Sequence, residues 1–262
     1  MKEAIAIIGA GNMGAAFYKG ISRELNRVRI NVCDHNIDKL KALDAEHTYT
    51  DPRKAIAEAS VVLLAVKPQS AKELLESLSP ALKDHFVISV MAGISIETLH
   101  RLTKSPTIVR AMPNLAAKIQ KGFTGWVSSA QTAPKERAFA KELFVAVGEE
   151  MELPQESMID TIGALSGSGP AYFFLLAEIL ASKAVAEGFT PDEAARIARQ
   201  TLIGSGALLE SDPRTPAQLR AAVSSRGGTT LAALQSFQDD HVEDLFFTGM
   251  DRAIARAREL NQ

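Results

Sequence analysis

The sequence predicts an α/β domain over residues 1–154, followed by an all-helical domain over residues 155–262. The first observation is that short apolar runs alternate with helical patterns throughout the first domain. These runs are continuous rather than interrupted by polar residues, which is typical of parallel strands covered by helices on both faces of a sheet. The second observation is that no strand pattern occurs from Ser157 onward, so the remainder is expected to be helical.

The elements of the first domain follow from this alternation. Each short apolar run is a predicted strand, and each longer segment between the runs is a predicted helix. We expect strands at residues 4–8, 29–33, 61–66, 86–90, 107–112, 123–127 and 150–153, and helices at residues 12–25, 38–43, 52–59, 69–78, 96–102 and 134–145.

The second domain is read from helix start and stop signals. Pro170 suits the first position of a helix, and Gly188 ends that helix. Thr190 and Glu193 have the spacing of a capping box, which starts the next helix. We expect helices at residues 170–187, 190–209, 216–223, 229–237 and 239–260.

The first helix of this domain is apolar around its whole circumference at residues 172–177. Such a helix must be buried on every side. Either the first domain covers it or a second copy of the chain does. Because so small a helical unit cannot surround the helix alone, we expect an intertwined homodimer formed through the helical domain, with a higher oligomer of dimers as an extension.

The composition limits the classes of partner. A formal net charge of −2 and a pI near 6.2 give no broad positive field for nucleic acid. The single cysteine, Cys33, and the lack of a signal-peptide pattern predict a cytoplasmic protein. Glu178 and Lys183 interrupt the apolar stretch at residues 171–186, so no membrane span is expected. The histidines show no metal-ligand spacing, so no metal site is expected.

A glycine-rich motif follows the first predicted strand and opens the first predicted helix, and it comprises Gly9, Ala10, Gly11, Asn12, Met13 and Gly14. In this pattern Gly9 permits a tight turn, Gly11 lets the backbone approach a pyrophosphate, and Gly14 lets helix and strand pack closely. The helix N-terminus adds free N–H groups and a partial positive charge. In this context the motif predicts a Rossmann-like domain that binds NAD or NADP.

The residues after the second predicted strand bear on the choice between these cofactors. Asp34 lies twenty residues beyond Gly14, where an acid bonds the ribose 2′-hydroxyl of NAD and repels the 2′-phosphate of NADP. Alternatively, Asp34 points away, and His35 and Asn36 contact a phosphate. Considered without other information, these residues favour NAD slightly.

The second domain lacks the base that an alcohol substrate requires. Some hydroxyacid dehydrogenases place a lysine on the first long helix after a glycine-rich turn. Here residues 166–174 carry phenylalanines at those positions, and Lys183 comes three turns later. An alcohol needs a proton acceptor, whereas an imine is readily protonated near neutral pH. This pattern favours reduction of an imine.

A second glycine-rich loop runs into a helix far downstream of the first, and it comprises Ser224, Ser225, Arg226, Gly227, Gly228, Thr229 and Thr230. Small polar residues and paired glycines before a helix start are typical of an anion-binding loop. The alternative is a capped helix start that binds nothing.

Several stretches together resemble pyrroline-5-carboxylate reductases over the whole chain, and they comprise residues 9–14, 65–69, 91–93, 110–114, 166–172 and 223–230. The last two are specific to that family. The resemblance implies NAD(P)H-dependent reduction of 1-pyrroline-5-carboxylate to L-proline, the last step of proline biosynthesis. It implies a helical domain that serves both dimerisation and substrate binding.

The resemblance also implies residue roles in substrate binding. Backbone N–H groups at Gly227, Gly228, Thr229 and Thr230, together with the Ser225 hydroxyl, would hold the substrate carboxylate. The hydroxyl of Thr230 would orient the imine and assist proton delivery, which makes it the expected catalytic residue. Glu156 matches a substrate-side acid in some relatives, or is a solvated charge near the domain boundary.

Further positions match the cofactor site of the family, and they are Ala65, Val66, Lys67, Pro68, Ala92, Gly93, Asn114 and Asn36. Asn114 is expected at the nicotinamide end, or alternatively only ends a strand, and Asn36 matches a contact to the 2′-phosphate. The family mostly uses NADPH, so NADPH is the expected cofactor, with NADH plausible because of Asp34.

The sequence departs from the family pattern at two positions, and two alternative functions remain open. Arg226 stands where many relatives have proline, and Ala222 stands where some have an asparagine that reaches the cofactor. A non-catalytic dinucleotide sensor is one rival, and reduction of the six-membered cyclic imine is the other. Residues 166–170 are expected mainly to form a tight turn between the domains.

Overall fold

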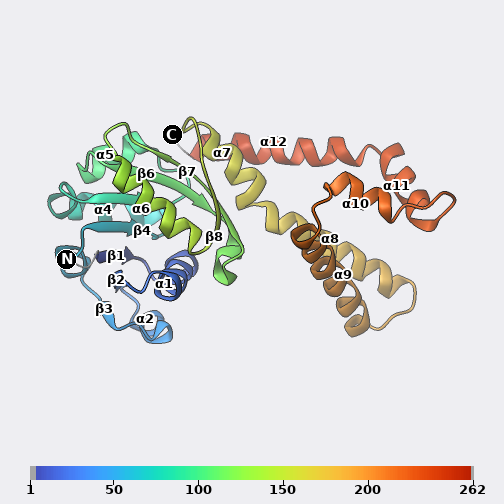
Figure 1. The fold of residues 1–262 in the computed structure, drawn as a ribbon, viewed down its shortest axis with the longest axis horizontal. Coiled ribbons are helices and arrows are strands. Elements are labelled where there is room, and N and C mark those ends of the chain that lie inside the picture. The colour runs from blue at the N-terminus through green and yellow to red at the C-terminus, as the bar shows by residue number, and fades with distance from the viewer. Residues whose placement is uncertain (1–3, 261–262) are drawn as a thin grey trace. The chain divides into compact units, whose positions relative to one another are not determined.

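A computed structural model describes residues 4–260 of the chain and divides them into two compact units (Figure 1). The first unit comprises the chain up to Ser168 together with the residues from Ala253 onward, and the second comprises Gly169–Arg252. The predicted fold class, an α/β domain followed by a helical domain, is confirmed. The extreme ends of the predicted domains, residues 1–3 and 261–262, lie outside the described residues.

The first unit is built on an eight-stranded sheet with the order β3-β2-β1-β4-β5-β6-β7-β8. The strands are β1 (Ala4–Ile8), β2 (Arg29–Cys33), β3 (His47–Tyr49), β4 (Val61–Leu64), β5 (Phe86–Ser89), β6 (Ile108–Pro113), β7 (Gly122–Ser128) and β8 (Gly148–Glu152). The short edge strand β3 pairs in parallel with β2 and was not expected, because its three residues carry no apolar run. The reversal of strand order around β1 and β4 places a crevice at their carboxyl ends.

One strand departs from the expected parallel sheet, because β7 runs antiparallel to β6. The connection between them, residues 114–121, holds only a short 3-10 helix, η2 (Leu115–Ile119). A parallel return requires a crossover of about a dozen residues or more. The chain therefore turns back directly, and β8 then pairs in parallel with β7.

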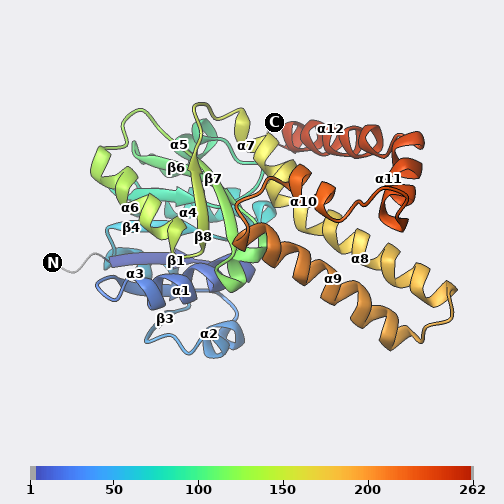
Figure 2. The same cartoon turned by 45° about the vertical axis from the view of Figure 1, so that its right-hand side comes forward.

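Helices cover both faces of the sheet (Figure 2). One apolar core lies under α1 (Asn12–Glu24), α2 (Ile37–Leu43) and α6 (Pro134–Val145). The other lies under α3 (Pro52–Ala57), α4 (Ala71–Leu82) and α5 (Ile96–Thr103), with the 3-10 helix η1 (Pro68–Ser70) before α4. Within β1, Ile5 and Ile7 face the first core while Ala6 and Ile8 face the second. Burial on both faces explains why the strand sequence is continuously apolar.

The second unit is helical, and its helices are α8 (Gly169–Ala186), α9 (Pro191–Ser211), α10 (Pro216–Ala222), α11 (Thr229–Asp239) and α12 (Val242–Leu260), the last of which continues into the first unit. The capping box before α9 is confirmed. The hydroxyl of Thr190 accepts from the backbone N–H of Glu193, and the Glu193 carboxylate accepts from that of Thr190 at 2.9 Å. Helices α11 and α12 are separated at His241, whose φ is +53°.

The expected tight turn at residues 166–170 is wrong, because these residues are helical. Helix α7 (Met158–Ile162) continues through a π-helical segment, η3 (Gly163–Gly167), into α8. The N–H of Ser168 donates to the carbonyl of Gly163 at 2.8 Å, which is the π-helical pattern. A Cβ on Gly167 would lie 3.0 Å from Met112, so this glycine allows close approach to β6 rather than a turn.

The resulting continuous helix, Met158–Ala186, has 29 residues, and an 18-residue stretch within it has a mean hydropathy of 1.3. By length and composition alone, this helix is long and apolar enough to cross a membrane. The sequence analysis expected no span here, because it considered only the shorter stretch at residues 171–186. One such helix is weak evidence, because core helices of soluble proteins have the same character.

The division between the compact units falls at Ser168 and Gly169, later than the predicted domain boundary at residues 154 and 155. The intervening helix α7 packs on β6 and β7. A Cβ on Gly125 in β7 would lie 2.8 Å from Ile162, so the strand and the helix are in close contact. These contacts join the start of the long helix to the α/β unit.

Candidate functional site

The glycine-rich loop between β1 and α1 has the geometry of a dinucleotide-binding turn. Gly9 has a φ of +105°, and a Cβ there would lie 2.6 Å from the carbonyl oxygen of Ala65. A Cβ on Gly14 would lie 1.8 Å from the carbonyl oxygen of Gly9. A Cβ on Gly11, by contrast, would meet nothing within 4 Å. Gly9 and Gly14 are therefore required by the protein itself, whereas Gly11 borders open space that suits a pyrophosphate.

A cavity of about 510 Å³ opens at this loop, at the carboxyl ends of β1, β2 and β4. Of the predicted cofactor residues, the cavity is lined by Gly9, Gly11, Asp34, Ala65, Val66 and Lys67. This is where open α/β sheets bind nucleotides, and its size is that of a small-molecule site. The geometry of the glycines and the position of the cavity both fit a nicotinamide dinucleotide.

Asp34 is held inside the protein at the end of β2. Its Oδ2 accepts a hydrogen bond of 2.8 Å from the backbone N–H of Ala10, and its Oδ1 accepts one of 2.9 Å from that of Asn36. Burial raises the pKa of Asp34, but these two bonds and the ammonium of Lys39 outweigh it and hold the pKa below its usual value. The pKa of the adjacent Cys33 thiol is raised to about 12, chiefly because the thiol is buried.

Lys39 is a pocket residue that the sequence analysis did not identify. Its Nζ lies 3.2 Å from Oδ2 of Asp34, and the residue lines the cavity. The sequence does contain a signal for Lys39. It is a basic residue in the predicted helix at residues 38–43, which directly follows the second predicted strand. Thr50, Pro52 and Ser70 also line the cavity without having been predicted.

Several predicted cofactor residues do not line this cavity, namely Ala10, Asn12, Met13, Gly14, Asn36, Pro68, Ala92, Gly93 and Asn114. The side chain of Asn36 caps α2 by accepting from the N–H of Asp38 at 2.9 Å. Gly93 has a φ of +72°, and a Cβ there would lie 3.1 Å from the backbone of Leu260. Each of these two residues therefore has a structural role of its own.

Asn114 is also engaged by protein groups. Its Oδ1 accepts from the N–H groups of Ala116 and Phe123 at 3.2 and 3.3 Å. Its Nδ2 donates to the hydroxyl of Ser166 at 3.0 Å. The amide thus ends β6, starts η2 and fixes the π-helical segment.

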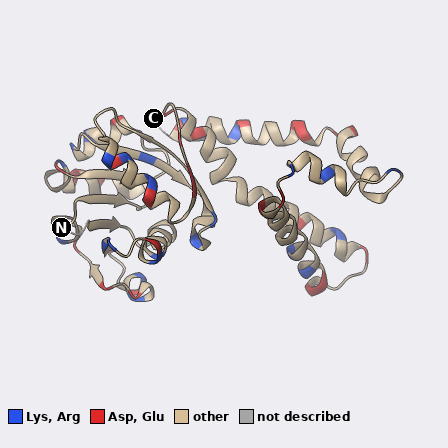
Figure 3. Cartoon of the chain, viewed as in Figure 1, with Lys and Arg blue, Asp and Glu red and all other residues tan. Residues whose placement is uncertain are grey.

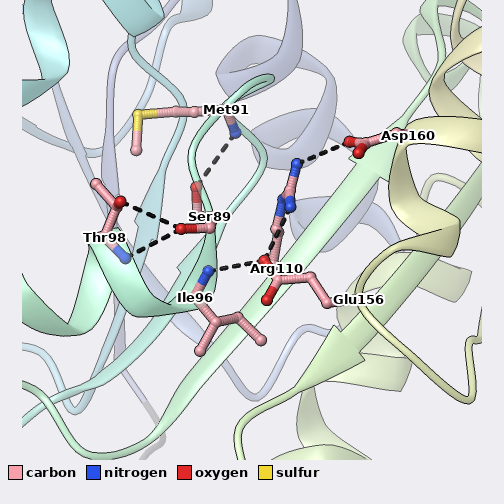
Figure 4. Close-up of polar contacts among 8 residues, drawn as sticks. Ser89, Met91, Ile96, Thr98, Arg110, Glu156 and Asp160 are labelled. Atoms are coloured by element: carbon pink, nitrogen blue, oxygen red, sulfur yellow. Dashed lines mark hydrogen bonds and ion pairs between the residues drawn. The ribbon is translucent and has the colours of Figure 1, made fainter. Parts of the chain in front are cut away.

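Glu156 belongs to an ion-pair cluster around the buried Arg110 (Figure 4). Its Oε1 accepts from the backbone N–H of Ile96 and from Nη1 of Arg110, both at 2.8 Å. Nη2 of Arg110 lies 3.3 Å from Oδ1 of Asp160. The Arg110 side chain is only 4% exposed, so the two carboxylates neutralise a guanidinium inside the first unit. The Glu156 side chain is itself 31% exposed, so its charge is paired and also reaches solvent.

The second glycine-rich loop lies in the helical unit. Gly227 has a φ of +74°, and Gly228 donates its N–H to the carbonyl of Ser225 at 3.0 Å. Gly228 is the N-cap of α11 and has no side chain, so it leaves the first N–H groups of that helix uncapped. Thr229 and Thr230 form the first turn. The loop therefore presents backbone donors in the way the sequence predicts for an anion site.

Charges of both signs are distributed over each unit, in agreement with the net charge of −2 (Figure 3). Helix α8 is the exception, because Glu178 and Lys183 are its only charged residues. Its apolar side chains are widely exposed in the single chain, including Phe173, Phe174, Leu175 and Ile179, each more than half exposed. Such a surface is expected to be covered in the assembled protein.

Comparisons with known proteins agree across the chain. Residues 156–260 match the family model for pyrroline-5-carboxylate reductase dimerisation, and residues 4–93 match that for NADP oxidoreductase, coenzyme F420-dependent. The pyrroline-5-carboxylate reductase of Pseudomonas aeruginosa is 36% identical over 98% of this chain and 96% of its own length.

Solved structures give the same result. A pyrroline-5-carboxylate reductase from Coxiella burnetii superposes with a TM-score of 0.91 and 33% identity over the whole of both chains. The Plasmodium falciparum pyrroline carboxylate reductase, solved with NADP bound, shares the fold with a TM-score of 0.85 and 22% identity over the whole of both chains. The resemblance found in the sequence is thus confirmed along the full length, and the chain belongs to the pyrroline-5-carboxylate reductase family of NAD(P)H-dependent oxidoreductases.

Proposed function

We infer that this protein reduces 1-pyrroline-5-carboxylate to L-proline, the last step of proline biosynthesis. The observation that carries this inference is the loop at Gly227 and Gly228, which opens α11 with uncapped backbone donors in a chain of this family. A substrate with one carboxylate and one imine nitrogen needs such an anion site and a single hydrogen-bonding hydroxyl nearby. The loop and Thr230 supply both.

The substrate carboxylate is held by the N–H groups of Gly227, Thr229 and Thr230, with the Ser225 hydroxyl as a further donor. Gly228, whose own N–H donates to the carbonyl of Ser225, keeps the loop closed beside the carboxylate. An anion is favoured there by the partial positive charge of the helix start. Arg226 is exposed beside this loop and adds a positive charge near it. Glu156 remains a proposed substrate-side acid only through the resemblance, since its carboxylate is engaged by Ile96 and Arg110.

Thr230 is the proposed catalytic residue. Its hydroxyl orients the ring nitrogen and assists delivery of the proton that the nitrogen carries in the product. When bound, the nicotinamide cofactor supplies the hydride that adds to the imine carbon. Gly11 and Lys67 hold the cofactor, the glycine through backbone approach and the lysine through its charge, while Gly9 and Gly14 give the loop its shape.

The remaining predicted contacts complete the proposed cofactor site, and they are Ala10, Asn12, Met13, Asp34, Asn36, Ala65, Val66, Pro68, Ala92, Gly93 and Asn114. Both NADPH and NADH are accepted, with NADPH modestly favoured. The family model for the first ninety residues is that of an NADP oxidoreductase, which supports this preference.

The protein works as a cytoplasmic homodimer formed through the helical unit, with a higher oligomer of dimers as an extension. Support comes from the exposed apolar face of α8, which lies within the residues matched to the dimerisation model.

The role of Thr230 is tested with a pair of substitutions. Thr230→Val removes the hydroxyl and keeps the shape, while Thr230→Ser restores a hydroxyl. We expect kcat/KM for pyrroline-5-carboxylate to fall by roughly a hundredfold in the valine variant, within the range for loss of a proton-delivering group, and to recover largely in the serine variant. Thr201→Val, at an exposed site in α9, is the matched control.

The readout is the initial rate of NADPH oxidation over a range of substrate concentrations, which gives kcat/KM. A valine variant with the kcat/KM of wild type removes Thr230 from the reaction. Tight cofactor binding without any turnover in the wild-type protein identifies a sensor, and a higher kcat/KM for the six-membered cyclic imine identifies that homologue as the substrate.

A further inference from the structure

The end of β2 raises the question of which residue recognises the group at the adenosine ribose. In folds of this kind the 2′-position of that ribose lies beside the end of the second strand. Asp34 occupies that end, but each of its carboxylate oxygens accepts from the backbone, Oδ2 from Ala10 and Oδ1 from Asn36. Its side chain is 5% exposed. The carboxylate is therefore bound to the loop and stabilised there in its charged form.

Lys39 stands beside Asp34 with a very different exposure. Its side chain is 43% exposed, its Nζ is 3.2 Å from Oδ2 of Asp34, and it lines the nucleotide cavity. The ammonium keeps donors free for another acceptor, because Lys has three and one of them suffices for Asp34. It is a cation at the strand end where the 2′-group is expected, on a side chain that can reorient.

The other cationic side chains near this region either bind other protein groups or follow a different strand. The guanidinium of Arg53 donates to the carbonyl of Ser77 at 3.1 Å, and Arg29 pairs with Glu58. Within residues 4–260, the basic side chains that line the cavity are His35, Lys39 and Lys67, and of these His35 carries a charge only when its imidazole is protonated. Lys67 follows β4 rather than β2, which leaves Lys39 at the ribose end.

We propose that Lys39 binds the 2′-phosphate of NADPH and is the residue that sets the preference for NADPH over NADH, an inference that rests on the cofactor site of the proposed function. The phosphate dianion meets a cation there, and the adjacent carboxylate, which stays ionised, is held toward the loop by its hydrogen bonds to Ala10 and Asn36. A ribose hydroxyl, as in NADH, gains little from the same ammonium. The lysine therefore discriminates by charge, while Asp34 shapes the loop for both cofactors.

The test measures binding rather than turnover, with the full-length protein. Dissociation constants for NADPH, NADH, adenosine 2′,5′-bisphosphate and AMP are determined by calorimetry for wild type, Lys39→Met and Lys39→Arg. We expect the methionine variant to lose about tenfold to a hundredfold in affinity for the two 2′-phosphorylated ligands, as for one charge-assisted hydrogen bond. Affinity for NADH and AMP should change less than twofold.

Two further variants sharpen the result. Lys39→Arg keeps the charge and should keep most of the preference for NADPH. Lys41→Met removes an exposed lysine of the same helix that does not line the cavity, and it should change no affinity. If Lys39→Met weakens NADPH and NADH equally, or weakens neither, or if wild type binds NADPH no more tightly than NADH, Lys39 does not read the phosphate.

This experiment separates the inference from the proposed reaction. A protein that binds NADPH through Lys39 but does not reduce pyrroline-5-carboxylate leaves the inference standing and overturns the reaction. A protein that reduces pyrroline-5-carboxylate with equal affinity for both cofactors does the reverse.

Discussion

The carboxylate of Asp34 at the end of β2 accepts a 2.8 Å hydrogen bond from the backbone N–H of Ala10 in the glycine-rich loop. This contact joins two segments that are 24 residues apart. The contact fixes the glycine-rich loop to the end of β2, and it occupies a carboxylate oxygen that would otherwise be available to the ribose. From the sequence, Asp34 is a candidate determinant of NAD preference. In the structure, its carboxylate supports the glycine-rich loop that both cofactors need.

Substitution of this acid should therefore weaken both cofactors together. In Asp34→Asn the amide keeps one acceptor oxygen and loses the other, so either Ala10 or Asn36 loses its partner. We expect the affinities for NADPH and NADH to fall by a similar factor, and the free energy of unfolding to fall by about 1–3 kcal/mol. Asp44→Asn, at an exposed left-handed position where asparagine is favoured, is the matched control. A selective loss of NADH alone would contradict this account.

The same pair of proteins gives a pH dependence with a definite sign. The pKa of Asp34 is lowered on folding, so its contribution to stability is complete above the unfolded value of about 3.9. That contribution is lost as pH falls through the lower folded value. Urea unfolding should show a constant difference between wild type and Asp34→Asn from pH 5 to 8, and a shrinking one below about pH 4. A difference that grows on acidification would show that the carboxylate is not stabilised in the fold.

Two glycines of the same loop should respond in opposite ways to alanine. A Cβ on Gly14 collides with the backbone of Gly9 at 1.8 Å, so Gly14→Ala should lower the melting temperature by many degrees or prevent folding. A Cβ on Gly11 meets nothing, so Gly11→Ala should melt like wild type. Its methyl group fills space proposed for the pyrophosphate, so affinity for both cofactors should fall at least tenfold. Normal binding by a stable Gly11→Ala protein would place the cofactor elsewhere.

The substrate loop is tested at Gly228. A Cβ there would lie 2.6 Å from the Ser225 hydroxyl oxygen and 3.1 Å from its carbonyl oxygen, so Gly228→Val forces the Ser225 hydroxyl, a proposed carboxylate donor, to move and crowds the backbone donors beside it. We expect KM for pyrroline-5-carboxylate to rise at least tenfold. Affinity for NADPH, measured by calorimetry, serves as the internal control and should stay near that of wild type. An unchanged KM would remove this loop from the substrate site.

Glu156 can contribute to substrate binding or to the stability of the fold. A role in binding predicts a change in KM, whereas a role in the fold predicts a change in the free energy of unfolding. Glu156→Gln removes one of the carboxylate charges that face the buried Arg110, so the free energy of unfolding should fall by about 1–3 kcal/mol, somewhat less than for a fully broken buried pair. KM should change less than twofold. Glu152→Gln removes a surface partner of Arg137 and should cost under about 1 kcal/mol. A large rise in KM with unchanged stability would assign Glu156 to the substrate.

The exposed apolar side of α8 predicts that the folded chain is not monomeric. Light scattering at micromolar concentration should give a mass at least twice the 28.1 kDa of one chain. Phe174→Asp places a charge on this side and should yield monomer or aggregate, whereas Glu178→Gln on the same helix should assemble normally. A folded wild-type particle of 28.1 kDa would contradict the prediction.

Much of this molecule was determined by local sequence. The order of strands and helices, the glycine-rich loop, and the capping box at Thr190 and Glu193 follow from short-range chemistry that leaves one favourable backbone choice. The family resemblance likewise depends on short motifs in order. These features could be predicted because each is decided within a few residues.

Other features depended on contacts between distant segments. The direction of β7 is decided by pairing with β6, and the π-helical continuation at residues 163–167 by close approach of Gly167 to Met112. The partners of Glu156 lie 60 and 46 residues away, so no local pattern could reveal that it neutralises a buried arginine. Only packing in three dimensions fixes such pairs.

Asp34 combines both kinds of determination. The sequence places an acid at the end of the second strand, because strand length and motif spacing set that position. Which way its carboxylate points depends on the donors that folding brings to it, the N–H groups of Ala10 and Asn36 and the ammonium of Lys39. A buried charge is stable only where such donors meet it, and their convergence is a property of the tertiary structure rather than of the sequence around the acid.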